Sequence, residues 1–343
     1  QAGDFPVYLV SPLGGIYNFA DSGSGGGSYA HWGLFYLAER FGNPLYLHFQ
    51  KKQAKGTPDD LIYYQPFESD LAIQEVPLDK AFRETEVATM RSSWTDPEAA
   101  FAGIKCGRNG IAHAHQDLGS FVFYALGEKW LVDLGSERQT YLRHQHHLPR
   151  SHFYRIREEG HNTLVFNPAE GYSQKPKGRS RIVRFETSPK SCFAVADLTD
   201  AYPAPVTSVK RGYRLTDHRR TLLVQDEIET EEPSEVWWFG HTAKGTSHSL
   251  DDDGRTAILE RGGRRCHAFL LAPARARFRV MNAAPLPSSP DPDIQNPNNG
   301  MRKLAIRLER AMKETVVVAF VPAYDFEPAP EADIAVIPLD AWE

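Results

Sequence analysis

Two histidines one residue apart, His113 and His115, precede two short apolar segments in "GIAHAHQDLGSFVFYALGEKWLVDLGS", residues 110–136. The second apolar segment ends at Asp133, and a further histidine, His161, opens the segment "GHNTLVFN". Imidazole and carboxylate groups are common protein ligands of Zn²⁺, and a site with three such ligands keeps a fourth position for water. The residue types therefore indicate a zinc site formed by two of these imidazoles and the carboxylate of Asp133.

This site depends on a β-hairpin. If "SFVFYAL" and "KWLVDLG" pair through a turn at Gly127–Glu128, Asp133 lies opposite Val122, at the end of the hairpin away from the turn. If the entry segment is extended, the side chains of His113 and His115 point to the same side. His161 joins them if its strand belongs to the same sheet. The alternatives are an isolated surface histidine and turn-forming aspartates, and Asp117 of "QDLG" fits a turn better than a ligand.

A basic segment at 134–160 separates Asp133 from His161 and is predicted to bind anions. Arginine can hold a carboxylate or a sulfate through two parallel hydrogen bonds. Tyr141 and Tyr154 are candidates for proton transfer, although packing in the core is the more common role of a tyrosine. The alternative for the segment is a solvated loop whose charges pair with one another. The predicted substrate-binding residues are Arg138, Arg143, Arg150, Arg155 and Arg157.

The amino-terminal part has helical patterns. Ser28 fits a helix N-cap, and Gly42 and Pro44 fit stop signals, which predicts a helix over about 29–41. "TPDDLIYYQ" repeats the pattern, with Thr57 as the cap and Pro58 at the first helical position. Two such helices bury little apolar surface alone, so residues 1–84 are interpreted as the end of a larger helical unit.

From residue 85 to 343 the pattern changes to short segments rich in branched and aromatic residues, such as "FVFYAL", "CFAVADL" and "ETVVVAFVP". Gly, Pro and Asp separate them at intervals typical of antiparallel sheets. We therefore expect a mainly β protein, with a large antiparallel β-sandwich at 85–343 and a short helical segment before it. The "SGSGGGS" run at 22–28 lacks the lysine of a phosphate-binding loop and fits a flexible connector.

The net charge of −5 argues against nucleic acid or a membrane surface as a partner, since both are anionic. No apolar segment approaches the roughly 20 residues of a membrane span, and no signal peptide is recognisable. The chain begins at Gln1, as expected of a mature or excised product. The three cysteines are far apart and fit buried apolar positions better than a disulfide framework or a metal site.

The segments "HAHQDLGSFVFYALGEKWLVDLGS" and "FYRIREEGHNTLVFN" resemble the heparinase II/III-like polysaccharide lyases, as do "VKRGYRLTDHRRTLLVQDEI" and "VWWFGHT". The resemblance covers about residues 85–325, and the preceding helices are similar to the last ones of the family's α/α toroid. It implies zinc ligation by His115, Asp133 and His161, and a place for His113 in the active cleft. It also implies β-elimination on an anionic, uronate-containing polysaccharide by a periplasmic or secreted bacterial protein.

The catalytic tyrosine of this family, and the group that neutralises the substrate carboxylate, lie upstream in the toroid. The chain is therefore expected to be a fragment of a longer enzyme, unless a tyrosine of the basic segment acts instead. A zinc-containing carbohydrate-binding β-sandwich without catalysis and a metal-dependent hydrolase are the alternatives. The identity of the polysaccharide and the oligomeric state stay open at this point.

Overall fold

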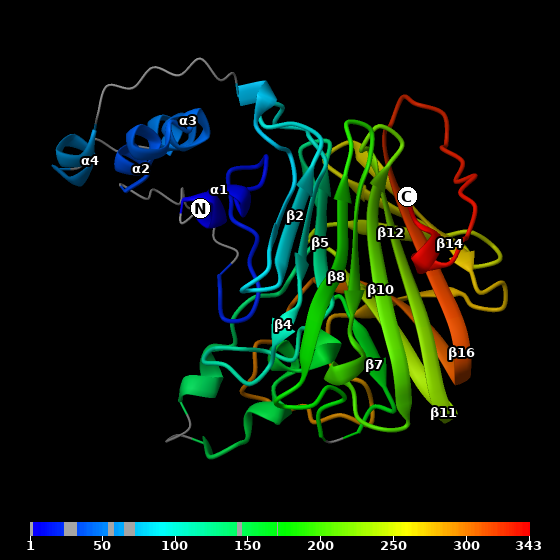
Figure 1. Cartoon of the computed structure of the whole chain (residues 1–343). Helices are drawn as coiled ribbons and strands as arrows, with labels where there is room; N and C mark the ends of the chain where they lie inside the picture. Colours follow the sequence, from blue (N-terminus) through cyan, green and yellow to red (C-terminus); the bar gives the residue numbers. More distant parts are fainter. Residues whose placement is uncertain (1–2, 24–32, 54–57, 65–72, 143–145, 170) are drawn as a thin grey trace.

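The computed structural model describes residues 3–23, 33–53, 58–64, 73–142, 146–169 and 171–343. Two antiparallel sheets form most of this structure, and the amino-terminal helices lie to one side of them, near strand β2 (Val87–Arg91) (Figure 1). The mainly antiparallel β architecture predicted from the sequence is confirmed.

The smaller sheet has five strands in the order β1-β2-β3-β5-β6. Every residue of β2, β3 and β5 is buried, so both faces of this part of the sheet are covered. Such strands are apolar along their whole length, which explains the unbroken run "FVFYA". The other four strands are β1 (Lys80–Phe82), β3 (Phe101–Lys105), β5 (Ser120–Ala125) and β6 (Glu128–Leu131).

The larger sheet has eleven strands, with a main path of β12-β13-β14-β16-β11-β10-β9-β8-β4. Off this path, β15 pairs with β16 and β7 pairs with β11. The strands are β4 (Gly107–Arg108), β7 (Leu164–Phe166), β8 (Arg179–Thr187), β9 (Cys192–Asp197), β10 (Val206–Thr216), β11 (Thr221–His241), β12 (Ser247–Leu250), β13 (Thr256–Arg261), β14 (Arg264–Ala272), β15 (Phe278–Asn282) and β16 (Arg302–Tyr324).

The two longest strands, β11 and β16, pair with each other along most of their length. Their register shifts on both sides of Ser234, next to Pro233. Proline has no N–H to donate to the ladder, so a central strand tolerates it at such an irregularity. The shift allows β11 to continue to His241, where the candidate site begins.

A single large apolar cluster fills the space between the two sheets. Phe121 of the smaller sheet packs against Tyr213 and Trp238 of the larger one, with ring centroids 5.8 and 6.3 Å away. Phe123 approaches Phe320 at 6.4 Å in the same way. The cysteines at 106, 192 and 266 are free and buried, as expected.

The helices are α1 (Asp4–Tyr8), α2 (Gly33–Phe41), α3 (Pro44–Gln53) and α4 (Pro58–Tyr63). α2 ends at Phe41, as Gly42 and Pro44 predicted, and Pro44 also begins α3, which was not predicted. Proline suits the first helical position, and the Asn43 side chain accepts a hydrogen bond from Leu45 N at 3.0 Å. The predicted caps Ser28 and Thr57 lie outside the described residues.

The helices pack through Leu34 and Tyr46 against Trp94, which follows β2. None of the helices in the described ranges has the length and apolar character needed to cross a membrane. Seven short 3₁₀ helices lie within the described residues: Ile73–Glu75, Arg138–Tyr141, Arg150–His152, Tyr154–Ile156, Glu158–Gly160, Thr199–Ala201 and Leu339–Ala341.

Candidate active site

The hairpin formed by β5 and β6 exists, but its turn differs by one residue from the prediction. Ala125 pairs with Glu128, so the turn is Leu126–Gly127, and both residues have positive φ, 55° and 74°. Two positive φ values are typical of the tight turns that match strand twist. A register shift then places Leu131 opposite Phe123, and the ladder ends there. Asp133 therefore lies beyond the paired strands rather than opposite Val122.

The segment that carries His113 and His115 is a series of turns, not the extended segment that we expected. His113 has φ 62°, a left-handed conformation that is uncommon for a residue with a side chain. Its side chain is 68% exposed, whereas that of His115 is fully buried. Residues in such a conformation are held by the contacts around them, and some of them occur at functional sites.

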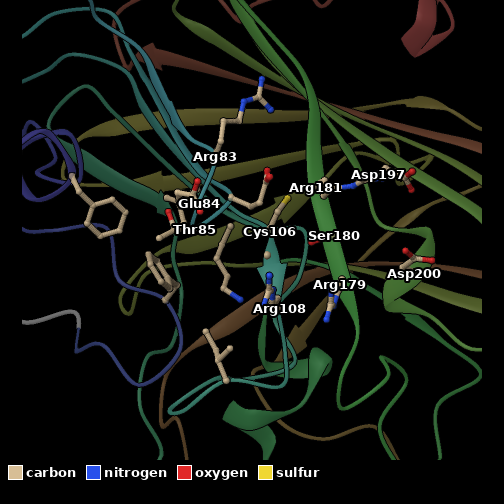
Figure 2. Close-up of a pocket in the computed structure, with 17 residues that line it drawn as sticks. Arg83, Glu84, Thr85, Cys106, Arg108, Arg179, Ser180, Arg181, Asp197 and Asp200 are labelled. Carbon is tan, nitrogen blue, oxygen red and sulfur yellow. The ribbon is translucent and has the colours of Figure 1, made fainter. Parts of the chain in front are cut away.

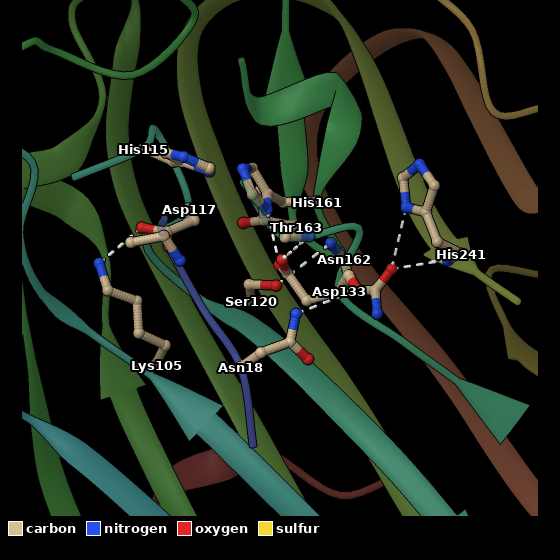
Figure 3. Close-up of polar contacts among 12 residues, drawn as sticks. Asn18, Lys105, His115, Asp117, Ser120, Asp133, His161, Asn162, Thr163 and His241 are labelled. Atoms are coloured by element: carbon tan, nitrogen blue, oxygen red, sulfur yellow. Dashed lines mark hydrogen bonds and ion pairs between the residues drawn. The ribbon is translucent and has the colours of Figure 1, made fainter. Parts of the chain in front are cut away.

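The three predicted zinc ligands lie together (Figure 3). Nδ1 of His161 is 2.7 Å from Oδ2 of Asp133, and the rings of His115 and His161 have centroids 5.2 Å apart. The other oxygen of Asp133 accepts a hydrogen bond from Gly135 N at 2.8 Å. In this arrangement, no group of three His, Cys, Asp or Glu side chains among the described residues is already placed to hold a metal ion.

Two buried nitrogens of this cluster, Nδ1 of His115 and Nε2 of His161, have no hydrogen-bond partner within the described structure. Burial lowers the pKa of His115, and the hydrogen bond to Asp21 offsets this only in part. Burial also acts to lower the pKa of His161, but the charge and hydrogen bond of Asp133 outweigh it, so the pKa is raised. Buried, unpartnered imidazole nitrogens fit the ligands of a metal ion.

Asn162 fixes this cluster at the seam between the two sheets. Its amide donates to the carbonyls of Phe121 at 2.7 Å and Val132 at 3.0 Å, and its oxygen accepts from His241 N at 2.6 Å. Val132 N also donates to His241 O at 2.9 Å. The "HNT" motif therefore joins β5, the end of β6 and the end of β11, which places Asp133 beside His161.

A buried ion pair of the larger sheet also holds the backbone near Asn162. The guanidinium of Arg211, on β10, makes hydrogen bonds of 2.6 and 2.9 Å to the carboxylate of Asp226 on β11. Its Nη1 also donates to the carbonyls of Gly119 and Asn162, both at 2.9 Å. Because the Arg211 guanidinium donates both to a carboxylate and to two backbone carbonyls, it holds the backbone of the site in place.

The segment between α1 and α2 also reaches the site, which the sequence did not indicate. Asp117 is fully buried and accepts a hydrogen bond from Lys105 Nζ at 2.5 Å, and this charge lowers its pKa despite burial. The same carboxylate accepts from Ala20 N at 3.2 Å, and Asn18 donates to Asp133 O at 3.3 Å. Asp117 thus anchors the segment that carries Asp21.

Asp21 connects the two histidines to Tyr141. Its carboxylate is 3.0 Å from His115 Nε2 and 3.2 Å from His113 Nδ1, and it also accepts a short hydrogen bond from the Tyr141 hydroxyl. The Tyr141 hydroxyl lies 2.7 Å from His113 Nδ1. Burial acts to raise the pKa of Asp21, but His115, Arg150 and His113 outweigh it, so the pKa is lowered. The carboxylate is therefore held in its ionised form.

The arginines of the basic segment have different surroundings. Arg138 is exposed, and Arg143 lies outside the described residues. Arg150 donates to Ala114 O at 2.9 Å, and its guanidinium carbon is 5.9 Å from the centre of the Tyr141 ring.

The other two arginines have internal contacts. Arg155 donates to Asn298 at 2.8 Å and to Ser136 O at 3.1 Å. Arg157 is 1% exposed and donates to backbone carbonyls, so its role in the structure is internal. Of the predicted substrate-binding arginines, Arg150 is thus the one that the described structure places beside Tyr141 and Asp21.

Tyr154 belongs to a separate, buried network. Its hydroxyl lies 2.7 Å from His241 Nε2 and accepts a hydrogen bond from Lys303 Nζ at 2.8 Å. Burial raises the pKa of Tyr154 and lowers that of Lys303 to about 7. Tyr154 is 1% exposed, and its hydroxyl contacts these internal groups.

The site residues that the sequence did not indicate are Asp21, His241 and Lys303. His241 belongs to the segment "VWWFGHT", which carries part of the family resemblance without singling out this histidine, and Lys303 stands in the segment "KLAIRLE". Asp21 borders the glycine-rich run at 22–28, where a polar residue is common and does not by itself indicate a functional site. Only contacts between distant parts of the chain distinguish these residues from their neighbours.

A family model described as "Heparinase II/III-like, C-terminal" matches residues 75–314. Heparan sulfate lyase HepC from Pedobacter heparinus is structurally similar, with a TM-score of 0.68 and 16% identity over 95% of this chain and 46% of that one. A crystal structure of heparinase III gives a TM-score of 0.68 and 14% identity over 94% of this chain and 48% of that one. The chain thus spans just under half of the length of these proteins. No curated protein matches the sequence.

Proposed function

Because the chain belongs to the heparinase II/III-like family, we propose that it is the β-sandwich part of a polysaccharide lyase that acts by β-elimination on a uronic-acid-containing polysaccharide. The observation that carries the proposal is the contact of 2.7 Å between the exposed side chains of Tyr141 and His113. Both side chains can give and accept protons at a surface that a polymer can reach.

β-Elimination requires two proton transfers at neighbouring carbons. A base takes the proton from C5 of the uronate, the electron pair of that bond forms the C4=C5 double bond, and the C4–O4 bond breaks. The leaving O4 then takes up a proton. Tyr141 and His113 lie within hydrogen-bond distance of each other, so one can act on the substrate while the other replaces or removes its proton.

The charges around this pair suit a substrate that becomes more negative during the reaction. Removal of the C5 proton places negative charge next to a carboxylate, and nearby cations stabilise that state. Arg150 is the cation beside Tyr141, and its position is set by hydrogen bonds to Ala114 O and Thr140. Asp21 orients Tyr141 and His113 and compensates the positive charge when His113 is protonated.

We also propose that His115, Asp133 and His161 hold Zn²⁺. The support is their proximity and the two buried imidazole nitrogens without a partner. Zinc bound here would supply a fixed positive charge that keeps the three side chains together. Since His161 and Asp133 contact each other directly, ligation requires a local rearrangement of this pair. The proton transfers remain with Tyr141 and His113.

We propose a periplasmic or secreted location, because uronate polysaccharides of this kind are met outside the cytoplasm. The partner would be an anionic polysaccharide, with no role for nucleic acid. The net charge of −5 agrees with this, since binding of a polyanion then depends on local basic groups rather than on the whole surface.

The test is to incubate the protein with a panel of uronate polymers, both as this chain and extended by residues encoded upstream. The products are followed by ultraviolet absorbance and by a reducing-end assay. A lyase gives an unsaturated uronate that absorbs, whereas a hydrolase gives new reducing ends without absorbance, and a binding module gives neither. Unsaturated product supports the proposal, and its absence from both forms of the protein on every polymer rejects it.

A further inference from the structure

A cavity of about 790 Å³ adjoins the candidate site, where β4 and β8 meet the turn between β1 and β2 (Figure 2). Phe19 and Ile111 form part of its wall. Phe19 lies two residues before Asp21, and Ile111 lies two residues before His113. The same two segments therefore line the cavity and carry the candidate site.

Three arginines gather on one side of this cavity. Arg108 of β4 lies directly opposite Arg179 of β8, and Figure 2 shows them at the same end of the cavity. Arg181 is two positions further along β8, on the same face as Arg179. All three are exposed, and within the described ranges none of their side chains forms a hydrogen bond or ion pair with another residue. Like charges placed opposite each other on neighbouring strands destabilise a sheet.

Carboxylates are also present, and one of them, Asp197, lies opposite Arg181 in the register of β8 and β9. No ion pair joins a cavity carboxylate to Arg108, Arg179 or Arg181 in the part of the chain that the structure describes. Oxygens of two carboxylates already accept backbone hydrogen bonds, Glu86 from Ile182 N at 2.8 Å and Asp197 from Thr199 N at 3.0 Å. The carboxylates that line the cavity are Glu84, Glu86, Asp197 and Asp200.

The shape of the cavity is fixed by close packing of the backbone. Gly107 has φ 98°, and a Cβ atom at this position would lie 2.8 Å from the carbonyl oxygen of Thr85. The turn at 83–86 therefore lies directly against β4 and holds one wall in place. Phe5 and Phe19, both half-buried, add apolar surface on which a sugar ring can lie.

We propose that this cavity binds an acidic sugar unit of the polysaccharide, beyond the units at the point of cleavage, with its sulfate or carboxylate held by Arg108, Arg179 and Arg181. Guanidinium groups match both oxyanions in charge and geometry. Glu84 and Asp200 accept hydrogen bonds from sugar hydroxyls. The class of ligand in this inference rests on the proposed function. The inference does not depend on the chemistry of cleavage.

The experiment measures binding by calorimetry, using this chain and a size-defined heparan-type hexasaccharide in sulfated and desulfated forms. The Arg108→Ala/Arg179→Ala variant should bind the preferred form at least about 10-fold more weakly than the wild type. Arg279→Ala removes an exposed arginine from β15 and is the matched control, with less than about a twofold effect. Unchanged melting temperatures would show that both variants are folded.

The sugar form identifies the group that is bound. A loss confined to the sulfated form assigns the arginines to sulfate, whereas an equal loss with both forms assigns them to the uronate carboxylate. Arg179→Lys keeps the charge but loses the paired hydrogen bonds, so it should retain only part of the affinity.

The proposal is overturned if the double variant binds like Arg279→Ala, or if the wild type binds neither form. These results are independent of the proposed lyase activity. Binding that needs Arg108 and Arg179 without any unsaturated product would keep the cavity assignment and reject the lyase. If the double variant forms product and binds the sugar as the wild type does, the cavity assignment is rejected and the proposed lyase activity is kept.

Discussion

The hydroxyl of Tyr141 lies 2.7 Å from Nδ1 of His113, although Tyr141 belongs to a 3₁₀ helix and His113 to a turn. Each has an exposed side chain and each also contacts Asp21. This contact depends on a left-handed backbone at His113 and on the anchoring of the segment before Asp21, so it is a property of the fold rather than of either segment alone.

Tyr141→Phe should lower the rate of unsaturated product formation by about 100-fold or more, because the hydroxyl is proposed to transfer a proton. The free energy of unfolding should change by less than about 0.5 kcal/mol, since the side chain is half exposed. Tyr324→Phe is the matched control, because that hydroxyl also donates to a carboxylate, Glu98. Equal rates for the two variants would remove Tyr141 from the reaction.

Protein purified without added metal should contain about one zinc ion per chain by elemental analysis. His115→Ala and His161→Ala should each lose most of it and melt at a lower temperature, since a metal that binds only the folded state stabilises it. His113→Ala should keep the metal and the fold while losing activity, because its exposed ring is not among the proposed ligands. Loss of zinc from His113→Ala to the same extent would contradict this division of roles.

Asn162→Ala should lower the free energy of unfolding by about 3 kcal/mol, because it leaves several buried backbone groups without a partner. Urea denaturation measures the change. Asn299→Ala, at an exposed position, should change the stability by less than about 0.5 kcal/mol. A small effect at Asn162 would show that water replaces its hydrogen bonds and that the seam does not depend on it.

Lys303 should make stability rise with pH on the alkaline side. Burial lowers its pKa from 10.5 to about 7 in the folded protein, so between these values the unfolded chain binds the additional proton. The cost of burying the charged amine is thus fully present below pH 7 and disappears as the pH approaches 10.5, a change of at most about 5 kcal/mol. In Lys303→Met this rise should be missing. Parallel pH profiles of unfolding free energy for the two proteins would contradict the assignment.

The sequence predicted the β-sandwich because its signals are local. Segments such as "FVFYA" and "CFAVAD" carry the apolar pattern of covered strands, and Gly127 marks the hairpin turn to within one residue. The end of α2 at Phe41 was predicted from Gly42 and Pro44, but α3 was not, because a proline that follows one helix can also begin the next.

The candidate site was predicted in part. The proximity of His115, Asp133 and His161 was predicted, but the expected reason was wrong: the strand after His161, β7, pairs with β11 of the larger sheet and not with the hairpin. Asp21, His241 and Lys303 could not, because each reaches the site through contacts between distant segments, such as the one between Ala20 and Asp117. The basic segment was treated as one unit, but burial divides it into the internal Arg157 and the accessible Arg138.

The seam at Asn162 has a consequence for the order of folding. The contacts that complete the site join residues 94 positions apart, as between Asp21 and His115, and 79 positions apart, as between Asn162 and His241. Contacts over such separations form slowly, because a long loop must close before they contribute any stability. A nascent chain or a folding intermediate with only one sheet would therefore have its local hairpins but no assembled site. Binding competence should appear in the last, slowest phase of refolding, after most of the secondary structure has formed.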